Sequence, residues 1–121
     1  MHEGRWTKLW SDPFDGYVTW SGHSAWYLIE TIESFNGMRY VSSTGQGNFL
    51  QWFSASAFGG TNYSNTPIGA ACNTDEPYHI GGSDPSVYFG LWASGKNLAI
   101  SAWNSAVTPN YQVVGDPFVK H

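Results

Sequence analysis

Residues 66–79 read TPIGAACNTDEPYH, and the first part of this stretch has the composition of a strand inside a folded domain. The run IGAAC, residues 68–72, is apolar and has the length of a strand. Its small side chains allow helices to pack closely on both faces, as they do in parallel sheets. Residues 73–79 then combine turn-forming and titratable side chains. We therefore predict a buried strand followed by a loop that is a candidate site.

The segment before this strand is ambiguous between helix and strand. SAWYLIETIESF, residues 24–35, repeats apolar side chains at helical spacing, and an Asn-Gly pair stands directly after it as a stop. This pattern predicts a helix with Glu30 and Glu33 on its exposed face. Because short apolar runs are ambiguous by periodicity, a strand over WYLIETI, residues 26–32, is the alternative.

Capping residues outline the remaining helices. Asn48 can cap a second helix, which ends at Gly59-Gly60 and has an aromatic buried side. Pro85 stands in the first turn of a further helix, where proline is tolerated, with Ser83 or Asp84 as its cap.

Gly95 separates that helix from another, which Asn97 opens. The predicted order is a strand over 16–20, helices over 24–35 and 49–57, a strand over 68–72, helices over 85–94 and 98–106, and a strand over 111–114. Strands that alternate with helices favour an α/β fold. We predict a small, largely parallel sheet of three or four short strands, packed by helices.

Length and composition limit the possible classes. The chain has 121 residues, enough for a single domain over 1–121, in which residues 1–23 are poorly assigned. A net charge of −4 with only five Lys and Arg argues against a nucleic-acid groove. No apolar run reaches the ~20 residues of a membrane span, and no secretory signal is recognisable. One cysteine cannot form an internal disulfide, so we expect a cytoplasmic protein. We assign it no cofactor.

The second half of the chain, residues 66–121, resembles the end of gingipain-type cysteine peptidase domains, which have the caspase–haemoglobinase fold. Such domains close with a strand and an acidic-proline turn, then a helix broken at glycine, a second helix, and a last strand that ends in Gly-Asp-Pro. TPIGAACNTDEPY and VYFGLWASGKNLAISAWNSAVTPNYQVVGDPFV follow this order. The matching residues are Glu76, Pro77, Gly95, Ala102, Trp103, Gly115, Asp116 and Pro117.

The first half departs from that family. The resemblance implies a catalytic histidine in a GHG-like turn, for which His23 in SGHS is the candidate. It also implies a cysteine after a following strand, and no cysteine stands at a matching place. Ser34 and the serines of SASAFGG, Ser54 and Ser56, are the available hydroxyl groups. The resemblance therefore implies the fold of a truncated peptidase domain without its complete catalytic set.

The central loop offers the remaining chemistry. Cys72 closes a strand of small residues, so we interpret it as a buried thiol rather than a nucleophile. Asp75, Glu76 and His79 are a weak candidate for a metal or acid/base cluster, because loop spacing does not define ligand geometry. The simpler interpretation is that Asp75 or Glu76 accepts backbone N–H groups in the turn before proline. Asp116 is expected to form a similar turn after the last strand.

The chain contains seven tryptophans, which are the main indication of a binding surface. Trp52, Trp92 and Trp103 lie on predicted helices and are expected in the core. The N-terminal tryptophans Trp6, Trp10, Trp20 and Trp26 are candidates for an exposed surface that binds a protein or a sugar.

These sequence features are compatible with three alternative functions. The preferred one is a non-catalytic α/β module that acts through binding or self-assembly. The alternatives are a hydrolase that uses His23 with Cys72 or a serine, and a carbohydrate-binding module that uses exposed tryptophans; His23, Ser34, Cys72 and Glu76 are the candidate catalytic residues. We expect a homodimer, because a small sheet leaves an open edge and the chain has little lysine to protect it. Trp6, Trp10 and Trp20 would lie in that interface.

Overall fold

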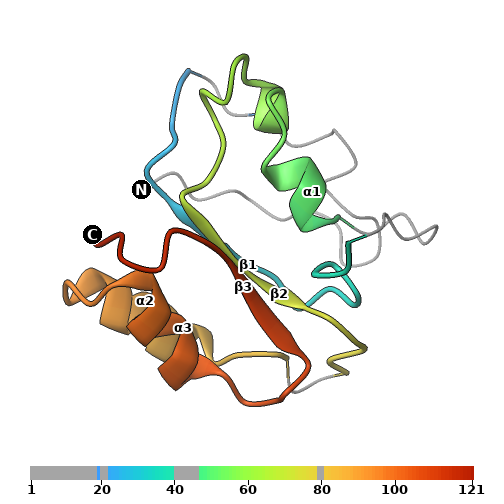
Figure 1. Cartoon of the computed structure of the whole chain (residues 1–121), viewed down its shortest axis with the longest axis vertical. Helices are drawn as coiled ribbons and strands as arrows, with labels where there is room; N and C mark the ends of the chain where they lie inside the picture. Colours follow the sequence, from blue (N-terminus) through green and yellow to red (C-terminus); the bar gives the residue numbers. More distant parts are fainter. Residues whose placement is uncertain (1–18, 20–21, 40–46, 79–80) are drawn as a thin grey trace.

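A computed structural model describes residues 19, 22–39, 47–78 and 81–121. In this part of the chain, helical segments lie on both sides of a three-stranded sheet (Figure 1), and the fold is α/β as predicted. The elements are β1 (Leu28–Glu30), α1 (Phe49–Trp52), the 3-10 helix η1 (Ala57–Gly59), β2 (Gly69–Asn73), α2 (Pro85–Ala93), α3 (Leu98–Ser105) and β3 (Tyr111–Gly115).

The sheet is mixed, with β2 in the centre. β1 runs parallel to β2, and Ile29 lies opposite Ala70. β3 runs antiparallel to β2, and Cys72 lies opposite Gln112. The prediction of a largely parallel sheet is therefore wrong. Each helix of a connection reverses the chain direction, so two helices between β2 and β3 produce an antiparallel pair where one would produce a parallel pair.

The predicted helix over 24–35 is wrong, and the strand alternative is correct for Leu28–Glu30. The apolar side chains of this run alternate across the sheet: Ile29 lies in the core on one face and Leu28 packs on the other. Pairing with the buried strand β2 outweighs the weak local preference for a helix, because it buries both faces of the run. Glu30 and Glu33, expected on an exposed face, are both partly buried.

The second predicted helix begins where expected but is shorter. The Asn48 side chain accepts a hydrogen bond from the Leu50 N–H (2.9 Å), and the Gln51 side-chain oxygen accepts one from the Asn48 N–H (2.8 Å), which forms a capping box. The α-helical turns end at Trp52, whose indole is buried. A left-handed residue in the core, Phe58 with φ of 52°, interrupts the helical path further on.

The elements of the second half agree with the predicted order. The Asp84 carboxylate accepts the Ser86 N–H (2.8 Å) at the start of α2, and Asn97 accepts the Ile100 N–H (2.9 Å) at the start of α3. Gly95 between them has φ of 85°, a conformation that favours glycine. The Asp116 carboxylate accepts the Phe118 N–H (2.9 Å) in the predicted turn after β3.

The core consists of two apolar clusters, one on each face of the sheet, and β2 contributes to both. Every residue of β2 is buried, as its composition predicts. A Cβ on Gly69 would lie 2.7 Å from a methyl carbon of Leu98, so β2 needs small residues where α3 crosses it. One cluster contains Ile29, Trp52, Ala57, Phe58, Ala70 and Cys72, and the other Ala71, Tyr88, Trp92, Leu98 and Ala102.

Several predictions concern residues outside the described ones. These are the strand over 16–20, His79 as a ligand, and the interface role of Trp6, Trp10 and Trp20.

Candidate functional site

Two of the four candidate catalytic residues meet at the carboxyl ends of the parallel strands. The Ser34 hydroxyl, in the turn after β1, donates a hydrogen bond to the Glu76 carboxylate (2.6 Å) in the loop after β2. Ser34 is buried, and the neighbouring turn is anchored by the Phe35 N–H, which donates to the Asp75 carbonyl (3.3 Å). This end of the sheet is where α/β folds commonly place ligands.

Asp75 has the turn role expected from the sequence. Its carboxylate accepts the backbone N–H of Glu76 (2.8 Å) directly before Pro77. The amide of Asn110, in the loop before β3, also reaches this carboxylate (3.4 Å). Asp75 therefore connects the loop after β2 to the loop before β3, while Glu76 accepts the hydrogen bond from Ser34.

Cys72 is buried below the same turn. A Cβ on Gly37 would lie 2.9 Å from the Cys72 Cβ, so the turn backbone covers the thiol closely. Cys72 is 1% exposed, and this burial raises the pKa of its thiol to about 12. A nucleophilic cysteine requires a lowered pKa. The prediction of a buried thiol is confirmed.

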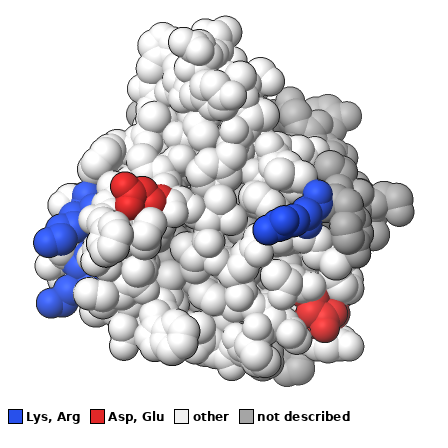
Figure 2. Space-filling view, viewed as in Figure 1, with Lys and Arg blue, Asp and Glu red and all other residues white. Residues whose placement is uncertain are grey.

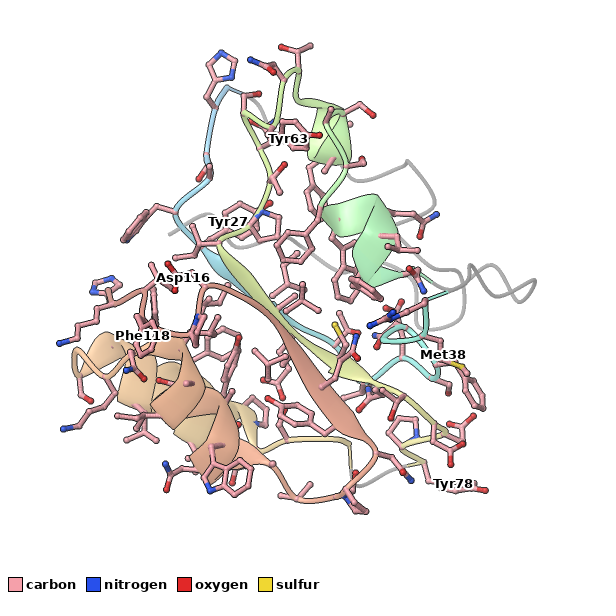
Figure 3. The ribbon with its side chains drawn as sticks, viewed as in Figure 1. Tyr27, Met38, Tyr63, Tyr78, Asp116 and Phe118 are labelled. Atoms are coloured by element: carbon pink, nitrogen blue, oxygen red, sulfur yellow. The ribbon has the colours of Figure 1, made fainter. Side chains whose placement is uncertain are left out.

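His23 belongs to the opposite end of the molecule. It precedes β1, and the adjacent Ser24 N–H donates to Asn65 (3.3 Å) near the Tyr63 loop. Figure 3 shows Tyr63 at one end of the molecule and Tyr78, two residues from Glu76, at the other. The histidine therefore does not join the Ser34–Glu76 pair. Ser54 and Ser56 lie between α1 and η1.

A buried polar cluster on the α2 side of the sheet was missed by the sequence analysis. The Ser83 hydroxyl donates to one oxygen of the Glu30 carboxyl group, whose pKa is raised by burial. In the described part of the chain, the other Glu30 oxygen and the hydroxyl of the fully buried Tyr88 have no hydrogen-bond partner. Burial also raises the pKa of Tyr111 beside them. The helical interpretation of 24–35 concealed this cluster, because it placed Glu30 in solvent.

Buried asparagines support the loops around the Ser34–Glu76 pair. The Asn73 amide donates to the carbonyls of Thr31 (3.1 Å) and Glu33 (2.9 Å), and its backbone N–H donates to Asn36 (2.7 Å). A Cβ on Gly82 would lie 2.0 Å from the Asn73 side-chain oxygen, so the Gly82 backbone packs directly against this buried amide. These contacts satisfy buried backbone groups, which explains why asparagine occurs where a core strand ends.

Large apolar side chains are exposed on and beside α3, and this contradicts one prediction. Trp52 and Trp92 are buried as expected, but Trp103 is 85% exposed. Small residues of α3 face the sheet in its place, among them Ala102 and Ser101. Ile100 and Val107 are also exposed. Neither α2 nor α3 contains a charged residue. Figure 2 shows charged side chains to the left and right of an uncharged band.

The described residues provide no metal centre and no membrane span. No three His, Cys, Asp or Glu side chains among them are grouped so that they could hold a metal ion. Within the same ranges, no helix has both the length and the apolar character needed to cross a membrane.

Comparisons with known proteins found no match to the chain among family models, curated proteins or solved structures.

Proposed function

We propose that the chain is a non-catalytic α/β module that acts by self-association, with a second half similar to the end of gingipain-type peptidase domains. The observation that carries this proposal is the 85% exposure of Trp103 on a helix pair without charged residues. Large exposed apolar patches mark interaction surfaces, and tryptophan is enriched among the residues that dominate binding energy.

The arrangement of the candidate residues gives less support to a hydrolase. Acyl transfer requires a nucleophile, a base and an orienting group within hydrogen-bond reach. Ser34 has a carboxylate partner, but His23 lies at the other end of the molecule. Cys72 keeps its proton far above neutral pH. The hydrogen bonds of Ser34, Asp75 and Glu76 shape one loop or connect two, which is a structural role.

The substitution Trp103→Ala tests the proposal. We expect it to weaken self-association at least tenfold in sedimentation velocity, because it removes the largest side chain of the exposed α3 surface. Phe118→Ala is the matched control, since Phe118 is 78% exposed but lies outside the helix pair. Equal dissociation constants for Trp103→Ala and the wild-type chain would contradict the role of α3.

Carbohydrate binding is the second candidate, favoured by the exposure of Trp26 (62%) together with Trp103. Aromatic rings at this exposure can stack on sugar rings. Titration of tryptophan fluorescence with soluble β-linked and α-linked glucose oligosaccharides tests it. A saturable change that Trp103→Ala abolishes, in a chain that remains monomeric, would favour this function over self-association.

A further inference from the structure

We infer that β3 is the self-association site, and that it pairs antiparallel with β3 of a second copy to form a continuous six-stranded sheet. This inference rests on the proposed self-association and specifies its geometry. It locates the interface on described residues rather than on the N-terminal tryptophans.

The outer side of β3 has backbone groups available for pairing. Among the described residues β3 is an edge strand, because the sheet order there is β1-β2-β3. The Thr74 N–H donates to the Asn110 carbonyl (3.0 Å) at the end of the β2–β3 ladder. In an antiparallel pair the backbone N–H and C=O groups of successive residues point alternately toward the partner strand and away from it. The backbone groups of Gln112 and Val114 therefore point toward β2, and those of Tyr111 and Val113 point outward.

The opposite strand supports this assignment of direction. Asn73 lies opposite Tyr111, and its backbone N–H bonds the side chain of Asn36 on the β1 side, away from β3. No described residue forms a backbone hydrogen bond with the outward groups of Tyr111 and Val113. Unpaired edge groups at this spacing fit an extended strand rather than a helix or a small molecule.

The sequence and register of β3 also lack charge, proline and a bulge, which are among the features that prevent edge pairing. Protected edges carry lysine, proline or a bulge. The sequence of β3 is YQVVG, without charge or proline, and its five residues pair with β2 in unbroken register. Figure 1 shows β3 and α3 in front of β1 and α2, and the same view in Figure 2 is uncharged along its middle.

The required contact area explains why α3 takes part. A five-residue strand is about 17 Å long and offers a strip about 10 Å deep, or roughly 170 Å². A stable interface needs ~800 Å² from each partner. Ile100 and Trp103 on α3, and Val107 just after it, are exposed and are the apolar area that we infer joins this strip in the interface.

The strand β3 is self-complementary, so a second copy of the chain is a suitable partner. A two-fold axis at Val113 places Val113 opposite Val113 and Tyr111 opposite Gly115. These are the residues with outward groups, so each donor meets an acceptor of the other strand. No charge meets a like charge, because the strand has none. Two-fold dimers are also the commonest closed assemblies.

The substitution Val113→Pro tests the inference. Proline removes the outward N–H and places its ring at the edge, while the bonds from Gln112 and Val114 to β2 remain. We expect at least a hundredfold increase in the dimer dissociation constant by sedimentation velocity. Val113→Ala is the matched control, because it loses similar packing but keeps the N–H, and its dimer is expected to persist.

Hydrogen exchange of the wild-type chain provides a second measurement that does not depend on the folding of the proline variant. The Tyr111 and Val113 amides are expected to be protected at high protein concentration and to lose protection on dilution, whereas the Gln112 amide stays protected. A dimer that persists in Val113→Pro, or a wild-type dimer with unprotected Tyr111 and Val113 amides, overturns the edge pairing and leaves self-association intact. A wild-type monomer at all concentrations overturns both.

Discussion

Single polar residues hold the loops at the carboxyl ends of β1 and β2. Asn73 is the clearest case, because one buried side chain bonds two carbonyls of the segment after β1. This segment leads into the turn in which Ser34 bonds Glu76. The backbone of the same turn packs against Cys72. The Ser34–Glu76 contact is thus the end of a supported network rather than an isolated pair.

Asn73→Ala is expected to lower the free energy of unfolding by roughly 2–4 kcal/mol, because it leaves buried carbonyl groups without donors. Asn104→Ala is the control, since Asn104 is exposed and donates one hydrogen bond to the carbonyl of Ile100. A surface change of this kind costs within about 0.5 kcal/mol. Urea denaturation measures both, and equal stabilities would contradict the role given to Asn73.

The thiol of Cys72 is expected to react slowly in the native protein. Its pKa is raised from 9.0 to about 12, so at pH 8 the thiolate fraction is roughly a thousandfold below that of the unfolded chain. Between pH 9 and pH 12 the unfolded chain binds fewer protons than the native protein, so stability falls as the pH rises through this range. Labelling with a chromogenic disulfide reagent checks the first expectation, and rapid native labelling at neutral pH would contradict it.

At the scale of elements, α2 and α3 show how glycine can either weaken or terminate a helix. Gly90 lies inside α2, and a Cβ there meets no atom within 4 Å. Gly95 also has open space, but its φ of 85° strains any other residue. A substitution at Gly90 therefore measures the effect of helix propensity on stability, and one at Gly95 measures the effect of backbone conformation.

Gly90→Ala is expected to raise the free energy of unfolding by about 0.5–1 kcal/mol, because alanine is the better helix former. Gly95→Ala is expected to lower it by about 1 kcal/mol, because alanine resists a positive φ. Thermal unfolding of the two variants measures the contrast. Equal shifts in the same direction would mean that α2 does not end as described.

The sequence predicted the second half of the fold better than the first, for a physical reason. The capping and terminating roles of Asp84, Asn97 and Gly95 involve only residues within about one helical turn, so the local sequence predicts them. β1 depends on pairing with β2 about forty residues away, and its three residues carry too little periodicity to indicate a strand. The direction of β3 and the exposure of Trp103 likewise depend on how α3 packs. Because the segment of β1 was predicted as a helix, the buried cluster around Glu30 was not predicted either.

At the scale of the whole molecule, the strands and helices form two small clusters around β2, and the outer surfaces of β3 and α3 remain apolar. A charge content of only 12% leaves few residues to solvate them. Covering this surface with a second copy would satisfy the edge of the sheet and the exposed Trp103 together. We therefore propose that the chain functions as a self-associating module.

Sedimentation equilibrium between about 1 and 100 µM tests this self-association, because it measures the molecular mass in solution. We expect a mass that rises with concentration from the 13.4 kDa monomer to twice that value. A single species at 13.4 kDa across the whole range would contradict it.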